Sequence, residues 1–329
     1  MLTDPSKRVL RYLRVSLTDR CNLRCLYCMP EEGAPSLAHD QILRYEEIEA
    51  VLRVAVRLGL TSVRLTGGEP LARRGVLQLV ERLHEIPGLD DLSLTTNGTL
   101  LAEAAAPLRR AGLQRLNIGL PSLDRAIYAR LTRRDALPQA LAGLETALAE
   151  GFRPLKVNVV VLRGINDELA PFLALTAAKP VEVRFIEYMP IGPLASQSFF
   201  LPAIEIERRL RAEGPLQEAE PPMGMGPATR YWRLPGAPGR LAVLAPMSEH
   251  LCPFCNRLRL TADGRLLPCL FSDQEIDLKP FLRPSLAERS LEEAFHRAAA
   301  EKPSCMAPLL PQERHNSPRQ GYYMVQIGG

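Results

Sequence analysis

The chain has 329 residues, of which 46% are apolar, and its 41 basic and 37 acidic side chains leave a formal net charge of +4. This apolar content excludes a disordered chain, and the length predicts one large domain or two domains. The nearly balanced charge does not indicate a nucleic-acid partner. No run of about 18 uncharged apolar residues and no signal-peptide core occur, so we expect no membrane span and a cytoplasmic location.

Short apolar runs alternate with helical patterns along the first 190 residues. Strands are predicted at residues 12–18, 62–66, 92–95, 115–120, 156–162 and 181–188, and the helices between them include residues 76–83 and 100–110. Strands that alternate with helices form right-handed βαβ units and a parallel sheet. Six such units predict an α/β fold, an incomplete (βα)6 TIM-like barrel over residues 1–190.

The pattern changes after Met189, where residues 190–202 and 220–227 are loop-like. Strands are predicted at residues 229–234 and 240–244, and a helix at residues 286–299. Residues 257–261 and 265–269 flank Ala262-Asp263-Gly264, which is a hairpin signal. Residues 191–329 are therefore predicted to form a C-terminal α+β extension.

Three cysteines, Cys21, Cys25 and Cys28, follow the first predicted strand in the pattern C-x3-C-x2-C. Three thiolates can hold three irons of a [4Fe–4S] cluster and leave the fourth iron open to another ligand. Zinc sites usually have four protein ligands in C-x2–4-C pairs, so the spacing favours a cluster. A disulfide framework is not expected in a chain with an odd number of cysteines and no secretory signal.

This motif resembles the C-x3-C-φ-x-C signature of the radical S-adenosylmethionine (SAM) superfamily, with Tyr27 at the aromatic position. The stretch from Thr66 to Pro70, which includes Gly67, Gly68 and Glu69, resembles the GGEP element of the same superfamily. The resemblance implies that this backbone binds the amino group of SAM. It also implies that SAM binds the open iron and is cleaved to a deoxyadenosyl radical.

A second group, Cys252, Cys255 and Cys269, has the spacing C-x2-C-x13-C. We favour a second [4Fe–4S] cluster with an open iron, although a zinc site with His250 or Cys305 as fourth ligand stays open. Arg257 and Arg259 follow directly, and strand alternation places them on one face. They predict a basic clamp for an anionic ligand; the alternative is a solvated strand edge.

Four cations lie inside predicted parallel strands, which are normally apolar. They are Arg14, Arg64, Lys156 and Arg184. A buried cation is costly unless it is paired, so either acids such as Glu182 and Glu187 partner them, or they converge on a polyanionic substrate such as a triphosphate.

Within the superfamily, the chain resembles the GTP 3′,8-cyclase family along nearly its whole length. The shared features are Cys21/Cys25/Cys28, residues 66–70, 95–98, 156–158 and 184–187, Cys252/Cys255/Cys269 and the terminal Gly328-Gly329. The resemblance implies an enzyme that converts GTP to (8S)-3′,8-cyclo-7,8-dihydroguanosine 5′-triphosphate, the first step of molybdenum cofactor biosynthesis. It implies two [4Fe–4S] clusters and SAM, with guanine on the second open iron and the Gly-Gly tail in the active site.

The resemblance also assigns contacts by position. The implied SAM contacts are Tyr27, Gly67, Gly68, Glu69, Gly119 and Met189. The implied GTP contacts are Arg14, Arg64, Thr95, Lys156, Arg184, Arg257, Leu258 and Arg259. The partners that it implies are an electron donor of the flavodoxin or ferredoxin type and a downstream cyclic pyranopterin monophosphate synthase, and it allows a homodimer.

One stretch departs from the family pattern. Where the family has N-V-S-L-D, this chain has Asn117-Ile118-Gly119-Leu120-Pro121. Gly119 replaces a serine that contacts SAM in the family, and Pro121 lacks a backbone donor.

Two alternatives have other functions. A peptide-modifying radical SAM enzyme with two clusters would leave the four strand cations unexplained, and such enzymes often carry more cysteines in the second region than the one spare, Cys305. A zinc-binding protein without catalysis predicts colourless protein and no cleavage of SAM.

Overall fold

The computed structural model describes residues 1–191, 196–221, 229–249, 251–305 and 322–328. Within these ranges, no helix is long and apolar enough to cross a membrane.

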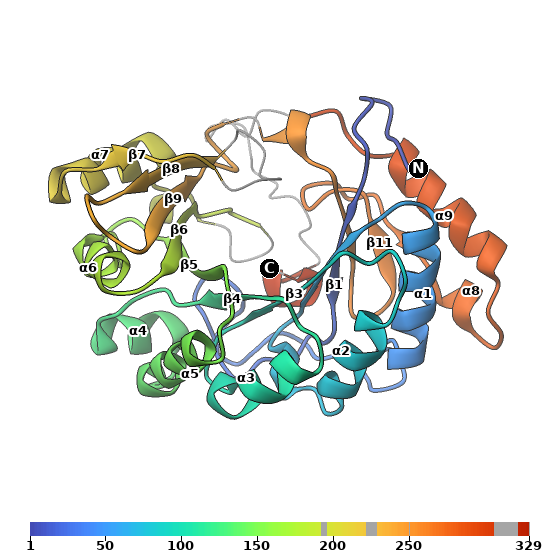
Figure 1. The fold of residues 1–329 in the computed structure, drawn as a ribbon. Coiled ribbons are helices and arrows are strands. Elements are labelled where there is room, and N and C mark those ends of the chain that lie inside the picture. The colour runs from blue at the N-terminus through green and yellow to red at the C-terminus, as the bar shows by residue number, and fades with distance from the viewer. Residues whose placement is uncertain (192–195, 222–228, 250, 306–321, 329) are drawn as a thin grey trace.

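Six strands form the centre of one sheet, each parallel to the next in chain order. They are β1 (Tyr12–Ser16), β2 (Ser62–Thr66), β3 (Asp91–Thr96), β4 (Arg115–Gly119), β5 (Leu155–Val161) and β6 (Val181–Glu187). The helices between them are α1 (Tyr45–Arg57), α2 (Val76–His84), α3 (Leu101–Arg110), α4 (Arg125–Thr132), α5 (Leu137–Ala149) and α6 (Ala170–Ala178), and a 3-10 turn, η1 (Pro70–Ala72), follows β2. These helices cover the outside of the curved sheet (Figure 1). The predicted (βα)6 barrel is confirmed.

The C-terminal part extends this sheet at both edges. Strand β9 (Arg240–Leu244) pairs in parallel with β6, and β10 (Arg257–Leu260) pairs in parallel with β1. The sheet order is β12-β11-β10-β1-β2-β3-β4-β5-β6-β9-β8-β7, so the described strands form an open barrel. The remaining elements are α7 (Ala203–Glu213), β7 (Gln217–Glu218), β8 (Thr229–Arg233), β11 (Arg265–Leu267), β12 (Ile276–Asp277), α8 (Lys279–Leu282), α9 (Glu288–Ala300), α10 (Met324–Ile327) and the 3-10 turns η2 (Gln197–Phe199) and η3 (Cys252–Phe254).

Helix α1 illustrates why the helices form where they do, because the spacing of Ile48, Val51, Leu52, Ala55 and Val56 in the sequence predicts a helix with one apolar face. Its apolar residues recur at helical spacing, and Ile48, Val51, Leu52 and Ala55 are fully buried against the sheet. Each large aliphatic side chain buried in this way contributes about 1.5–3 kcal/mol. The backbone N–H of Arg44 donates to Glu47 Oε2 (2.6 Å), which closes the first turn.

Helices α6 and α7 had no counterpart among the predicted elements. Helix α6 reads APFLALTAA and is apolar on nearly every side, so its sequence has no 3.6-residue alternation. The two helices pack beside β6 and β9 at the junction of the barrel and the extension.

One hydrophobic core crosses that junction. It contains Leu13 and Phe185 from the barrel together with Ile206, Leu258 and Phe295 from the extension. The division at residue 190 stays a prediction, because the sheet and the core are continuous across it.

Candidate active site

The loop after β1 brings Cys21, Cys25 and Cys28 to the carboxyl ends of the barrel strands, where parallel α/β folds bind their ligands. The three cysteines line one cavity with residues from the loops after β2, β3 and β4 and from α10. No Lys, Arg, Asp or Glu of the described chain lines this cavity. The first cysteine group therefore opens on an uncharged space.

The sulfur atoms of this group have few protein donors. Cys21 Sγ accepts from Leu23 N (3.4 Å) and from Asn97 Nδ2 (3.8 Å). Burial raises the pKa of Cys21 to about 12, so this sulfur keeps its proton at neutral pH unless a metal displaces it. The contact between Cys25 and Cys28 lowers the pKa of Cys25 and raises that of Cys28, so the three sulfurs differ in acidity although each can bind iron as a thiolate.

Gly67 and Gly68 are required by the close approach of two loops. A Cβ on Gly67, whose φ is +145°, would lie 2.6 Å from the Thr18 carbonyl oxygen, and one on Gly68 would lie 2.1 Å from that of Arg20. The backbone N–H of Gly68 donates to Thr18 O (2.6 Å). Only glycine permits this contact, which fixes the turn after β2 against the segment that leads into Cys21.

Glu69 is fully buried and does not line the cavity. Its carboxylate accepts from Leu71 N (3.0 Å), Thr96 Oγ1 (2.8 Å) and Asn97 N (2.8 Å). Burial raises the pKa of Glu69 to about 7, against the lowering effect of these donors. The side chain thus joins the turn after β2 to the loop after β3, and any contact with SAM at this position would involve its backbone.

The other predicted SAM contacts surround the same space. Tyr27 and Gly119 line the cavity. Met189 packs in a small apolar cluster that also touches Cys28. A Cβ on Gly119 would meet only Thr96 O, at 3.8 Å, which is ordinary van der Waals contact. The position therefore has room for a serine side chain.

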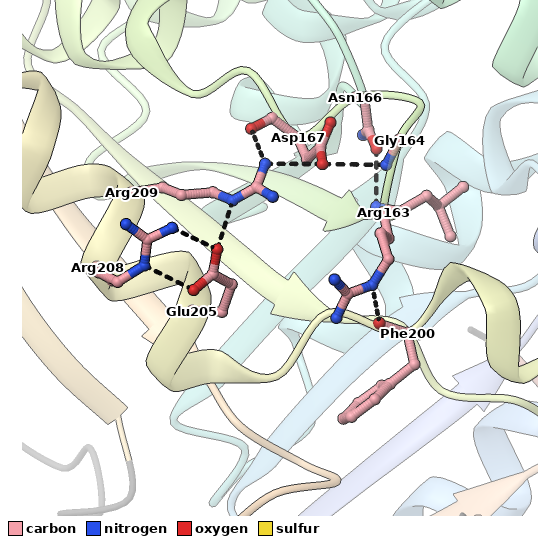
Figure 2. Close-up of polar contacts among 9 residues, drawn as sticks. Arg163, Gly164, Asn166, Asp167, Phe200, Glu205, Arg208 and Arg209 are labelled. Atoms are coloured by element: carbon pink, nitrogen blue, oxygen red, sulfur yellow. Dashed lines mark hydrogen bonds and ion pairs between the residues drawn. The ribbon is translucent and has the colours of Figure 1, made fainter.

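The wall formed by Gly119 and Pro121 is held by the loop after β5. The buried Asn166 donates through Nδ2 to Pro121 O (2.7 Å) and to Val160 O (2.9 Å). Its neighbour Asp167 accepts from Arg209 of α7 (2.7 Å), which also contacts Glu205 (Figure 2). The extension thereby fixes one side of the cofactor cavity.

Helix α10 lies between the two cysteine groups. Met324 and Val325 line the first cavity, and Met324 and Ile327 pack with Leu267 and Leu270 on either side of Cys269. The short red helix α10 lies inside the curve of the sheet (Figure 1).

Gly328 lies against Thr66 at the end of β2 and beside Arg259, while insertion of the tail into the active site stays a prediction. The carbonyl oxygen of Gly328 accepts from Arg259 Nη1 (2.8 Å), and a Cβ there would lie 3.1 Å from Thr66 Cγ2. Gly328 has a φ of +73°, which favours glycine. Gly329 lies outside the described residues.

The second cysteine group lies beside β10 and β11. Cys252 and Cys255 bracket the η3 turn, and Cys269 follows β11. Lys302 Nζ contacts Cys255 Sγ (3.7 Å), and Phe271 N donates to Cys269 Sγ (3.4 Å). Cys305 is exposed, and His250 lies outside the described residues.

The strand cations form rows across the sheet. Arg259, Arg14 and Arg64 are direct register partners on β10, β1 and β2. Thr95, Asn117 and Lys156 are register partners on β3, β4 and β5. Alternation along each strand gives the members of a row a common face.

Burial and mutual repulsion oppose the charges of these cations. Burial, reinforced by Arg259, lowers the pKa of Arg14, and burial with Arg257 lowers that of Arg259 to about 10. Burial together with Arg184 lowers the pKa of Lys156 to about 7. Such a group favours an anion among its members.

Two polar atoms in the second row have no hydrogen-bond partner within the described residues. They are the buried Thr95 Oγ1 and Asn117 Oδ1. A buried polar atom left unpaired costs about 1–3 kcal/mol, so a ligand is the expected partner.

Arg184 has an acidic partner. Its Nε donates to Glu182 Oε1 (2.5 Å), and both side chains are buried. Glu182 Oε2 also accepts from Arg240 Nε (2.8 Å). The ion-pair interpretation therefore holds for Arg184.

Glu187 does not partner a strand cation among the described residues, which corrects that alternative. It accepts from the backbone N–H groups of Ala203 (2.6 Å), Met247 (2.8 Å) and Ser248 (3.0 Å). Its carboxylate instead joins the start of α7 to the segment that leads toward Cys252.

The three residues predicted after Cys255 do not share one face. Arg259 is buried and Arg257 is exposed, and each lowers the pKa of Arg14, so both lie near the cation row. The Leu258 side chain is fully buried in the main core on the opposite face. Contact of Leu258 with a substrate would have to involve its backbone.

The residues fit iron–sulfur clusters better than a single zinc ion. Within the described ranges, no three Cys, His, Asp or Glu side chains converge on one point as zinc would require. Three thiolates that bind different irons of one cluster need no such convergence. The uncharged cavity beside the first group has room for an additional ligand.

Sequence reasoning missed several residues that order the site. Lys302 and Arg8 contact the second cysteine segments, and Asn166 supports Pro121. None of them lies in a cysteine or glycine motif, and their long-range contacts depend on the tertiary fold. The only sequence signal is that Lys302 is one of five lysines in a chain with 41 basic residues.

Comparison with known proteins agrees with this geometry. Residues 15–175 match the Radical SAM superfamily, and residues 181–307 match Molybdenum Cofactor Synthesis C. The GTP 3′,8-cyclase of Pelotomaculum thermopropionicum is 47% identical over 335 residues, and that of Moorella thermoacetica is 46% identical over 332 residues. Both alignments cover 100% of this chain and of the relative.

Among solved structures, Streptococcus suis SuiB bound to S-adenosylmethionine has the same fold. The TM-score is 0.60 at 13% sequence identity, with 86% of this chain and 68% of that chain covered. The full-length identity to curated relatives, the two matched families and the two cysteine groups lead to one conclusion. The chain is a radical SAM enzyme and belongs to the GTP 3′,8-cyclase family.

Proposed function

We propose that the chain converts GTP to 3′,8-cyclo-7,8-dihydroguanosine 5′-triphosphate, the first step of molybdenum cofactor biosynthesis. The observation that carries the proposal is the cation row Arg259–Arg14–Arg64, which runs between the two cysteine groups. These cations are held in a protein environment that disfavours their charge. A triphosphate would bring negative charge that offsets this burial and mutual repulsion.

The substrate side of the proposal uses residues of both rows. Arg14, Arg64 and Lys156 bind the triphosphate, and Arg257 and Arg259 extend the row toward the second cysteine group. Thr95 Oγ1 and Asn117 Oδ1, which lack protein partners among the described residues, bind polar groups of the ligands. Arg184 is held by Glu182 and acts through charge, since it lies close enough to Lys156 to lower the pKa of that lysine.

The cofactor side assigns SAM to the uncharged cavity. Cys21, Cys25 and Cys28 hold a [4Fe–4S] cluster, which with SAM supplies the radical that removes a hydrogen atom from the substrate. Gly67 and Gly68 fix the turn that faces the cofactor, while Tyr27, Gly119 and Met189 form its apolar surroundings. Glu69 fixes this turn by accepting hydrogen bonds from Thr96 and Asn97 in the loop after β3.

The second cysteine group is assigned a second [4Fe–4S] cluster whose open iron receives the guanine base. Cys252, Cys255 and Cys269 provide three thiolates, and Arg259 lies close enough to Cys269 and Cys255 for their charges to interact. Triphosphate and base would then be held at opposite ends of one row, so that the ribose lies toward the first cavity.

The partners follow from the reaction. The electron that cleaves SAM must come from a low-potential donor, for which we propose a flavodoxin or ferredoxin, and the product must be consumed by a cyclic pyranopterin monophosphate synthase. Reduced cysteines are retained in reducing compartments, which supports a cytoplasmic location. A homodimer is the assembly that we propose to test by light scattering.

The decisive experiment is anaerobic turnover of reconstituted protein with SAM, GTP and a chemical reductant. We expect loss of GTP and formation of a product of equal mass that contains the new ribose–guanine bond. Cleavage of SAM with GTP left intact would contradict the proposal and would favour the peptide-modifying alternative.

A further inference from the structure

Three segments must be held together to form the second cysteine group, and one buried lysine contacts two of them. Lys302 Nζ donates to Arg257 O (2.7 Å), two residues after Cys255, and to Pro268 O (2.8 Å), the residue before Cys269. The same nitrogen lies 3.7 Å from Cys255 Sγ. The three donors of one ammonium thus join the Cys255 and Cys269 segments.

The third segment is held by a second buried cation. Arg8 donates to Cys252 O (2.5 Å) and to Pro303 O (2.6 Å), the residue after Lys302. Arg8 is neutralised by Asp4, whose carboxylate lies 2.5 Å from its Nε in a buried ion pair.

Lys302 differs from Arg8 in its charge balance. It is 4% exposed, and no carboxylate of the described residues lies within ion-pair distance of its ammonium. A buried charge without a counter-ion is strongly unfavourable. The acceptor that can carry negative charge at this position is the sulfur of Cys255.

The residue type is also informative. The chain has 41 basic residues but only five lysines, so arginine is the usual cation here. Three acceptors around one point suit the compact ammonium of lysine, whereas the planar guanidinium directs its donors in one plane. Although Lys302 follows helix α9, its ammonium contacts carbonyls of other segments, so it does not serve as a helix C-cap.

We propose that Lys302 is a positioning residue and counter-ion of the second iron–sulfur cluster. It sets the spacing of the Cys255 and Cys269 segments and places a fixed positive charge against a ligand sulfur. This inference rests on the second cluster of the proposed function. Hydrogen bonds and positive charge at ligand sulfurs stabilise the reduced cluster, so Lys302 raises its reduction potential.

The test uses full-length protein in which Cys21→Ala removes the first cluster, so that bound iron reports on the second group. Lys302→Met removes the charge at similar length, and Lys302→Arg keeps the charge but cannot direct three donors from one point. Lys179→Met is the matched control, because Lys179 forms a partly exposed ion pair with Glu145 (2.9 Å). Each variant is reconstituted anaerobically and examined for iron content, melting temperature and midpoint potential by EPR titration.

We expect Lys302→Met to hold less than half the iron of the parent, or to retain iron with a lower midpoint potential. Lys302→Arg should retain iron with a potential nearer the parent, and Lys179→Met should match the parent. Unchanged iron and potential in Lys302→Met would overturn the inference. Equal losses of iron and of melting temperature in Lys302→Met and Lys302→Arg would also overturn it, because packing alone would then explain the role.

A separate variant distinguishes failure of the cluster itself. Cys269→Ala in the same background should abolish the remaining iron. If it leaves the iron unchanged, the second cluster of the proposed function is wrong, and the Lys302 inference fails with it. If it removes the iron while Lys302→Met has no effect, only the Lys302 inference is wrong.

Discussion

The two cysteine groups have the same number of sulfurs but opposite electrostatic surroundings. The cavity beside Cys21, Cys25 and Cys28 has no charged residue among its described lining residues, and it is shaped by close backbone contacts at Gly67 and Gly68. The group of Cys252, Cys255 and Cys269 lies beside Lys302, Arg257 and Arg259. Because each group has three cysteines, the number of sulfur donors does not show which ligand each group binds. The charge of the surrounding residues does distinguish them.

This difference in charge indicates which ligand can bind beside each cysteine group. An uncharged cavity does not repel the sulfonium cation of SAM, and a row of cations would do so. The same row favours a triphosphate. The C-terminal segment lies between the two regions, with Val325 in the first cavity and Gly328 bonded to Arg259.

The largest effects should come from removing one cluster at a time. Wild-type protein should bind about eight irons per chain, because two four-iron clusters are proposed. Cys21→Ala should bind about four and lose all cleavage of SAM, whereas Cys269→Ala should bind about four and keep slow cleavage. Iron and sulfide analysis with a SAM cleavage assay measures both. If Cys269→Ala holds as much iron as the wild type, the second cysteine group does not bind a cluster.

Deletion of Gly328 and Gly329 should have the next largest effect. The deletion removes the carbonyl that accepts from Arg259 Nη1, and Arg259 then loses a buried partner next to the cation row. We expect cyclisation to be lost while iron content and SAM cleavage persist, as measured by product formation beside the cleavage assay. Normal conversion of GTP by the truncated protein would show that the link between the two regions is dispensable.

Sequence reasoning predicted most of the barrel because buried parallel strands and amphipathic helices have local patterns, as residues 156–162 and helix α1 illustrate. It located the cysteines and the strand cations for a related reason, since unusual residues stand out against an apolar strand. It could not find Lys302, Asn166 or the Glu182–Arg240 contact. Those depend on segments far apart in the chain that meet only in the folded sheet.

Substitution of Lys156 tests whether the strand cations bind the triphosphate of GTP. It has no acid among Val157, Asn158 and Val159, but Glu182 is its register partner on β6 and raises its pKa against the larger lowering by burial. Lys156→Met should weaken GTP binding about ten- to a hundredfold, because a charge-assisted contact is worth roughly 1.5–3 kcal/mol, and should leave guanosine binding nearly unchanged. Calorimetry with both ligands measures this selectivity.

The pH dependence of stability gives an independent readout for the same variant. The pKa of Lys156 falls to about 7 in the folded protein, below the value of about 10.4 for an exposed lysine. The unfolded chain therefore binds more protons between these pH values, and Lys156 makes the free energy of unfolding rise with pH there. Lys156→Met should be more stable than the parent below pH 7, with the gap closing toward about pH 10. A variant that is less stable at pH 7 with unchanged preference for GTP would support an ion pair with Glu182 instead.

The smallest effect is expected at Gly119, which lines the uncharged cavity of the first cysteine group. A serine Cβ would meet Thr96 O at 3.8 Å, so Gly119→Ser should fold without loss of melting temperature. The added hydroxyl would face the cavity that Gly119 lines and offer SAM one neutral hydrogen bond, worth roughly 0.5–1.5 kcal/mol, or a two- to tenfold gain in affinity. GTP affinity should not change, because the cation row lies on other strands.

Binding of SAM to reconstituted protein, measured beside GTP binding, checks both statements. If Gly119→Ser weakens SAM binding while the melting temperature is kept, the wall near Pro121 contacts SAM too closely for a side chain, and glycine at this position is an adaptation of the cavity.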